Sequence, residues 1–102
     1  MKLLEIIPHL KNIRSVDNLI SVQIPNLELG LIDVFLKDSL NTQSEVKFFD
    51  ADAIPNNIEI VLEGVTYFNL FPLAMLQEMV EDYILTNPNI SELEIAENIL
   101  KY

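Results

Sequence analysis

The chain contains no cysteine, which excludes disulfide bonds, thiolate nucleophiles and cysteine-ligated zinc or iron–sulfur sites. Glycine is nearly as scarce, since only Gly30 and Gly64 are present. Two isolated glycines do not make the glycine-rich loop that cradles nucleotide phosphates. Because a cysteine-free chain fits a reducing compartment, we expect the protein to be cytoplasmic.

Long apolar runs are also missing. Glu5 and Pro8 interrupt the apolar N-terminal stretch, and no small-residue cleavage site follows, so the pattern does not predict a signal peptide. The longest stretch without a charge, residues 64–77, is shorter than the ~20 apolar residues that cross a bilayer. We therefore expect neither secretion nor a membrane span.

Residues for catalysis or metal binding are few. His9 is the only histidine, and the chain has no G-x-S-x-G motif, so a serine triad is not expected. Asp50 and Asp52 begin like a calcium loop, but the residues that follow do not supply its other ligands. A looser divalent site or a small carboxylate-dependent enzyme stays open. We expect no catalytic, cofactor-binding or metal-binding residues.

Basic residues are absent from a long part of the chain. The sequence has 16 acidic and 6 basic residues, a formal net charge of −10. No basic residue lies between Lys47 and Lys101, and that stretch contains ten acids: Asp50, Asp52, Glu59, Glu63, Glu78, Glu81, Asp82, Glu92, Glu94 and Glu97. Because lysine and arginine neutralise phosphates, we expect no binding to nucleic acid or to an anionic membrane.

Half of the residues are hydrophobic, which is typical of a folded chain, and the length predicts one domain over residues 1–102. Apolar spacing predicts a helix over residues 3–16, weakened by Pro8, and a strand over residues 18–24. Residues 27–40 suit either a helix or a strand, and we prefer a helix. A loop at 41–44 and a short strand at 46–49 follow.

Residues 58–71 have the pattern of a β-hairpin that turns at Glu63 and Gly64. The expected facing pairs are Leu62 with Val65, Ile60 with Tyr67, and Ile58 with Asn69.

Two helices are expected after the hairpin. The first runs from residue 72, with Pro72 as its first helical residue, to about residue 85. The second opens at an S-x-x-E capping box of Ser91 and Glu94 and reaches residue 102, with Leu93, Ala96 and Leu100 facing inward. These elements predict an α+β fold, a small antiparallel sheet of three or four strands with helices packed on it.

The first of these helices is predicted to have a polar stripe, which holds Gln77 and the acidic residues, and an apolar stripe of Leu73, Leu76, Met79, Val80, Tyr83 and Ile84. Glu78, Glu81 and Asp82 lie at positions i, i+3 and i+4, with no lysine between them. Such a stripe is either a solvated face or a surface that attracts a basic protein. Tyr67 could then serve as an aromatic anchor, whereas Phe68 and Tyr83 are expected in the core.

In size, charge and its acidic hairpin–helix region at residues 59–83, the chain resembles the immunity proteins of contact-dependent growth inhibition and related toxin systems. The resemblance implies that the protein binds and neutralises a basic toxin, such as a nuclease, by covering its phosphate site. The implied partner-binding residues are Asp50, Asp52, Glu59, Glu63, Tyr67, Glu78, Glu81 and Asp82.

A second interpretation is a non-catalytic adaptor or structural subunit. In that case Leu31, Val34 and Phe35 would be hidden in an oligomer. The sequence leaves the oligomeric state open.

Overall fold

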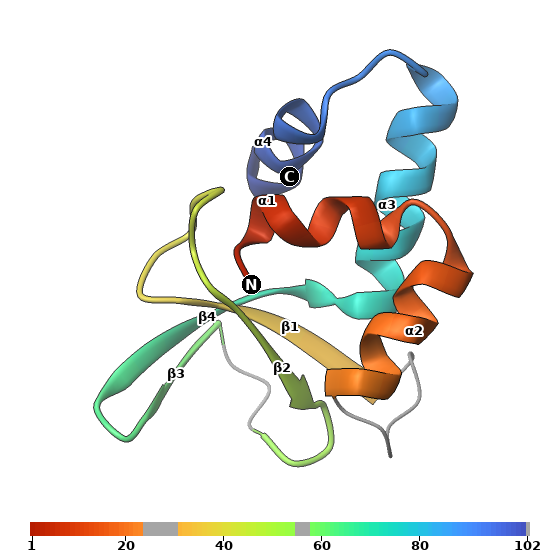
Figure 1. Cartoon of the computed structure of the whole chain (residues 1–102). Helices are drawn as coiled ribbons and strands as arrows, with labels where there is room; N and C mark the ends of the chain where they lie inside the picture. The colour runs from red at the N-terminus through yellow and green to blue at the C-terminus, as the bar shows by residue number, and fades with distance from the viewer. Residues whose placement is uncertain (24–30, 55–57, 102) are drawn as a thin grey trace.

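A computed structural model describes residues 1–23, 31–54 and 58–101. The elements, in chain order, are α1 (Leu3–Ile6), a 3-10 turn η1 (Ile7–Leu10), α2 (Ile13–Gln23), β1 (Ile32–Lys37), β2 (Val46–Asp50), β3 (Glu59–Leu62), β4 (Val65–Pro72), α3 (Leu73–Thr86) and α4 (Glu92–Lys101). Figure 1 shows these elements. The α+β class, the antiparallel sheet and the two C-terminal helices agree with the sequence prediction.

The four strands form one antiparallel sheet in the order β2-β1-β4-β3. The labelled helices lie on the same side of this sheet, and the β3–β4 hairpin extends beyond them (Figure 1). β4 leads directly into α3, so the hairpin tip and α3 lie at opposite ends of one strand. This connection separates the acidic residues of the hairpin, Glu59 and Glu63, from the acidic stripe of α3.

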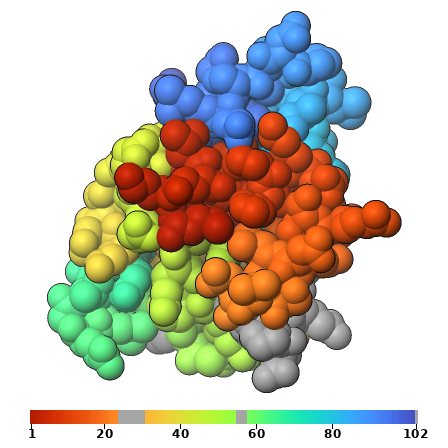
Figure 2. Space-filling view, in the orientation of Figure 1, coloured from red at the N-terminus to blue at the C-terminus, as the bar shows by residue number. Residues whose placement is uncertain are grey.

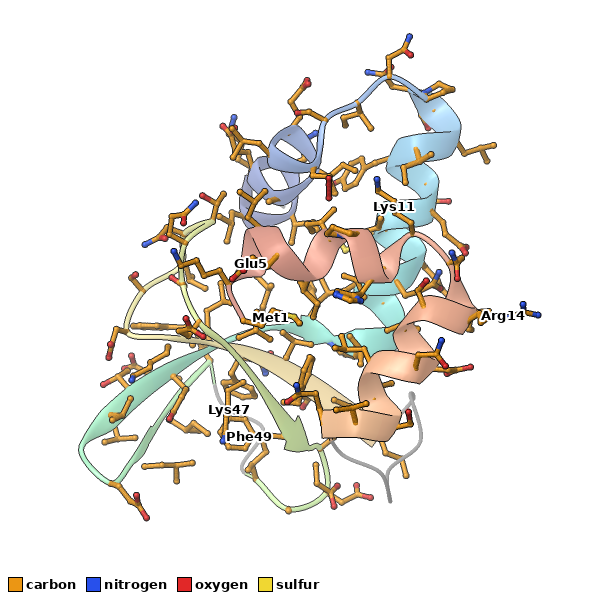
Figure 3. All side chains as sticks on the ribbon, in the orientation of Figure 1. Met1, Glu5, Lys11, Arg14, Lys47 and Phe49 are labelled. Carbon is orange, nitrogen blue, oxygen red and sulfur yellow. The ribbon has the colours of Figure 1, made fainter. Side chains whose placement is uncertain are left out.

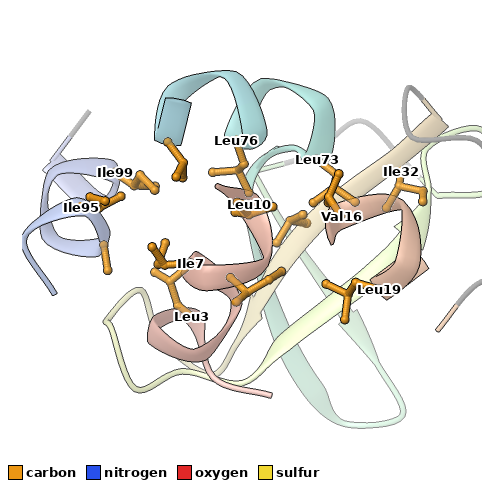
Figure 4. Packing of buried hydrophobic residues seen from close by; sticks show 14 of the residues in the cluster. Leu3, Ile7, Leu10, Val16, Leu19, Ile32, Leu73, Leu76, Ile95 and Ile99 are labelled. Atoms are coloured by element: carbon orange, nitrogen blue, oxygen red, sulfur yellow. The ribbon is translucent and has the colours of Figure 1, made fainter. Parts of the chain in front are cut away.

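The main hydrophobic core lies between the helices and one face of the sheet (Figure 4). It contains Leu3, Ile6, Ile7, Leu10, Val16, Leu19, Ile20, Ile32, Val34, Leu36, Leu73, Leu76, Val80, Ile95, Ala96 and Ile99. Every helix therefore contributes to the same core as β1.

The opposite face of the sheet has a smaller aromatic cluster. Side chains alternate along a strand, so Phe35 points away from the main core, toward which its neighbours Val34 and Leu36 point. Phe35 is nevertheless fully buried. Its ring meets Phe49 edge to face with centroids 5.2 Å apart, and Phe49 meets Tyr67 at 5.5 Å. These contacts bury apolar area where no labelled helix lies.

The strand predicted over residues 18–24 is wrong, because residues up to Gln23 belong to α2 and residue 24 lies outside the described part. Val16, Leu19 and Ile20 are buried at helical spacing, whereas Val22 is exposed. The apolar residues of this segment are compatible with the period of a strand and with that of a helix. The segment is helical because the helix packs its apolar residues on the core. The predicted helix over residues 3–16 is divided into α1, η1 and the start of α2.

The preferred helix over residues 27–40 is also wrong, since residues 32–37 form β1 and residues 27–30 lie outside the described part. Most of the segment is apolar because β1 is covered on both faces along residues 32–36. Val34 and Phe35 are fully buried within one chain, so the hypothesis that an oligomer hides them is wrong, although Leu31 is exposed.

The hairpin has the register that the sequence predicts. Leu62 pairs with Val65 and Ile60 with Tyr67. The Asn69 N–H donates a 2.8 Å hydrogen bond to the Ile58 carbonyl, which continues the same register.

Glu63 and Gly64, the two turn residues, have φ of 52° and 80°. Positive φ at both positions is the requirement of a type I′ turn.

The C-terminal helices depart from the prediction in three details. Pro72 is the last residue of β4 and the N-cap of α3, not its first helical residue. Gln77, expected on the polar stripe, is buried, and Leu93 is exposed. The buried face of α4 is Ile95, Ala96 and Ile99, because the helix packs on α1 and η1 through that row.

The capping box that opens α4 is confirmed. The Glu94 N–H donates a 3.1 Å hydrogen bond to Ser91 Oγ, and the Ser91 N–H donates one of 3.3 Å to Glu94 Oε1. α4 ends at Lys101 in the described part, and residue 102 of the predicted helix lies outside it.

Candidate functional site: acidic surfaces on the helices and the hairpin

The polar stripe of α3 displays three carboxylates to solvent. Glu78, Glu81 and Asp82 are exposed, while Leu73, Leu76 and Val80 on the other stripe are fully buried. The positions i, i+3 and i+4 place the three side chains next to one another on the helix surface. We call Glu78, Glu81 and Asp82 the helix surface.

α4 adds negative charge beside α3. It carries Glu92, Glu94 and Glu97, so the two helices together contain six acids and one base, Lys101. Figure 2 shows this C-terminal part, in blue, as the upper region of the molecule. The Glu94 carboxylate accepts a hydrogen bond from Ser91 Oγ in the capping box. Glu97 is exposed, and within the described part its carboxylate forms no hydrogen bond.

Basic side chains leave these acids unneutralised. Among the residues that the structure describes, one ion pair is present, between the terminal ammonium group of Met1 and Glu45 Oε2 at 2.7 Å. Lys2, Lys11 and Arg14 form none, and Figure 3 shows the Arg14 side chain pointing away from the protein. In the described structure, no basic side chain therefore forms an ion pair with the acids downstream of residue 47.

Glu45 is the acid that pairs with the Met1 ammonium group. The hydrogen bond from the Met1 ammonium group and its positive charge lower the pKa of Glu45, with Lys2 and Lys37 acting in the same direction and desolvation opposing them. This acid lies upstream of residue 47 and is not one of the predicted site residues.

The hairpin carries a second group of predicted site residues. Glu59 lies on β3, Glu63 in the turn and Tyr67 on β4. We call these three residues the hairpin surface, in which Glu59 lies on the sheet face that carries the helices and Tyr67 on the opposite face. The eight residues of β4 separate the turn from α3 by about 26 Å. Figure 2 likewise shows the hairpin, in teal, at the end of the molecule opposite to the C-terminal helices.

Asp50 and Asp52 lie apart from the hairpin surface. Asp50 ends β2 opposite Ile32, at the end of the sheet where α3 begins. The Asp52 N–H donates a 2.9 Å hydrogen bond to Asp50 Oδ1, so the two residues form a capped polar turn. Within residues 1–23, 31–54 and 58–101, no three His, Cys, Asp or Glu side chains are grouped to hold a metal ion.

Beside Tyr67 the structure places two residues that the sequence interpretation missed, Lys47 and Phe49. A hollow of about 420 Å³ beside Tyr67 is lined by Lys47, Phe49, Leu62, Glu63 and Val65. Lys47 Nζ lies 6.0 Å from the Phe49 ring centroid (Figure 3). Alternation along β2 predicts that Lys47 and Phe49 share one face of the strand. That this is the face of Tyr67 follows only from the pairing of β1 with β2 and β4.

Glu63 occupies a conformation that favours glycine, asparagine or aspartate. Its φ of 52° is in the left-handed region, where a longer L side chain has an energetic cost. Asn-Gly is the preferred pair for such a turn, and here the first position has a carboxylate on a longer side chain. A charge therefore stands at the hairpin tip despite a local cost in stability.

No family model, curated protein or solved structure matches the chain. Over the described residues, no helix is long and apolar enough to cross a membrane.

Proposed function

We propose that this chain is a cytoplasmic immunity protein that binds and neutralises a basic toxin, with a nuclease domain as the toxin class. The observation that carries the proposal is the helix surface, where Glu78, Glu81 and Asp82 are exposed together without a basic partner in the described structure. We infer a role in binding and not in catalysis.

The physical basis is electrostatic attraction between unlike surfaces. An uncompensated patch of one sign can raise the rate of association with an oppositely charged protein by about 10 to 10³-fold. A nuclease has positive charges at the site where the phosphates of its substrate bind, and the carboxylates of an inhibitor can bind there in place of the phosphates. The helix surface would supply these carboxylates, and Glu97 on α4 adds to the same field.

The helix surface also lowers the stability of α3. Glu78 faces Glu81 at i+3 and Asp82 at i+4, and like-charge pairs at these spacings cost about 0.2 to 0.5 kcal/mol each. An opposite charge from a partner would remove this repulsion. Binding a cationic surface therefore benefits from an arrangement that is unfavourable in the free protein.

A growth assay tests the proposal. The proposal predicts an adjacent open reading frame that ends in a basic toxic domain. That domain is expressed in cells with or without this chain, and we expect co-expression to restore growth. The purified pair should associate at low ionic strength and lose affinity steeply as salt is added. Growth arrest that persists with the chain present, together with no association at low salt, would contradict the proposal.

A further inference from the structure

The outer edge of β3 is open. β3 is the last strand in the order β2-β1-β4-β3, and among the described residues no further strand pairs with it. The Asn69 N–H bonds to the Ile58 carbonyl at 2.8 Å, so Ile58, Ile60 and Leu62 direct their backbone polar groups to β4. The N–H and C=O groups of Glu59 and Val61 consequently point outward.

The opposite edge of the sheet, formed by β2, is partly covered by the N-terminal segment. The Val46 N–H donates a 2.7 Å hydrogen bond to the Met1 carbonyl, and the Leu3 N–H donates one of 2.9 Å to the Ser44 carbonyl. The N-terminal segment thus covers the beginning of β2. In the described structure, β3 has no comparable cover.

Apolar side chains are exposed along β3, and at Ile58 directly before it, on both faces of the sheet. Ile58 is 84% exposed and Leu62 42% exposed on the face of Tyr67, and Val61 is 64% exposed on the face that carries the helices. Exposed edge strands are usually protected by lysine, proline or a bulge. Residues 58–62 contain no lysine or proline, and the register of β3 with β4 is regular.

We propose that the edge of β3 accepts an extended segment of a cationic partner as a fifth strand of the sheet, the segment having alternating apolar and basic residues. This inference rests on the proposed function only in taking the partner to be basic. Hydrogen bonds to the outward groups of Glu59 and Val61 would provide the main-chain pairing.

The side chains of β3 specify the chemistry of that segment. An apolar residue of the segment fits beside Ile58 and Leu62 on one face. On the other face a lysine or arginine lies within reach of Glu59, which is exposed and forms no ion pair in the described part of the chain. Glu63 adds a second free carboxylate at the tip of the same hairpin.

Charge also decides against a second copy of the chain as the occupant. Each copy has a formal net charge of −10, and self-pairing with Val61 opposite Val61 places Glu59 opposite Glu63. Like charges directly opposite one another in a sheet are destabilising. A basic segment replaces this repulsion by attraction.

A peptide titration followed by NMR tests the inference. The probe is a blocked heptapeptide of alternating valine and lysine, and the control peptide alternates valine and glutamate. We expect the lysine peptide to shift the amide signals of residues 58–62 and to slow hydrogen exchange at Glu59 and Val61. The glutamate peptide should bind at least about tenfold more weakly, because Glu59 and Glu63 repel it.

Two valine substitutions give a matched comparison. Val61→Lys places a protective charge on the edge and should reduce the affinity for the lysine peptide about tenfold or more. Val22→Lys makes the same change at a 78% exposed position on α2 and should leave the affinity unchanged. Circular dichroism melting curves of both variants check that each folds.

In the peptide titrations, three results overturn the inference: no binding of the lysine peptide, equal binding of the glutamate peptide, or equal loss with Val22→Lys. Sedimentation equilibrium that shows a dimer lost in Val61→Lys would make a second copy the occupant and also overturn it. The proposed function fails separately, if toxin binding and growth protection are absent while the lysine peptide still binds. If toxin binding is unaffected by Val61→Lys, the inference fails and the proposed function stands.

Discussion

The rings of Phe35 and Phe49 meet edge to face, with centroids 5.2 Å apart and an interplanar angle of 86°, on the sheet face opposite to the helices. Phe49 extends this contact to Tyr67 on the hairpin. The aromatic cluster therefore joins β2, β1 and β4 across the sheet. Through Phe49 it packs against Tyr67 of the hairpin surface, on a face of the sheet that the main core does not cover.

Phe35→Ala should lower the free energy of unfolding by about 3 to 5 kcal/mol, because it removes a fully buried ring and leaves a cavity. Phe49→Ala, at a half-buried position, should cost less. Urea denaturation of both variants measures the difference. A loss of less than 1 kcal/mol for Phe35→Ala would show that the aromatic cluster contributes little to stability.

Gln77→Met should raise the free energy of unfolding by about 1 kcal/mol. Gln77 is buried on α3, and its Nε2 atom has no hydrogen-bond partner among the residues that the structure describes, so the amide loses hydration without compensation. Methionine has a similar volume and no polar group to bury. Thermal and urea unfolding test this expectation, and a destabilised variant would mean that the amide is bonded in solution.

Glu63→Asn should stabilise the hairpin by about 0.5 to 1 kcal/mol, because asparagine tolerates the positive φ of this turn position better than glutamate does. Gly64→Ala is the matched opposite change. Its added Cβ meets no atom within 4 Å, so its expected cost of about 1 kcal/mol is conformational. Urea denaturation measures both, and a destabilised Glu63→Asn would contradict this account of the turn.

The sequence was sufficient where local chemistry decides the structure. The hairpin register follows from its two-residue turn, and the capping box of Ser91 and Glu94 marks the start of α4. The buried stripe of α3 was predicted with the exception of Gln77. In these segments, the turn residues, caps and apolar period all favour one structure.

The sequence was insufficient where tertiary packing decides. β1 is buried on both faces, and such a strand has no alternation that distinguishes it from a buried helix. Residues 18–23 alternate like a strand, yet α2 packs Leu19 and Ile20 on the core.

The candidate site was likewise predicted only where local periodicity was sufficient. Exposure of the acidic stripe follows from the period of α3. The separation of the hairpin surface from the helix surface follows instead from the path of β4, which periodicity alone does not show. Likewise, Lys47 and Phe49 beside Tyr67 could be recognised only once β2 was paired across the sheet.

The central claim is that the free carboxylates of α3 recruit a cationic protein. It is tested most directly by the rate of association with the basic toxin domain that the proposal predicts, measured at low ionic strength and compared for Glu81→Lys and Asp17→Lys. Both positions are exposed on helices, and both variants change the net charge equally. The account predicts that Glu81→Lys slows association by about tenfold and Asp17→Lys much less. Equal rates for the two variants would contradict it.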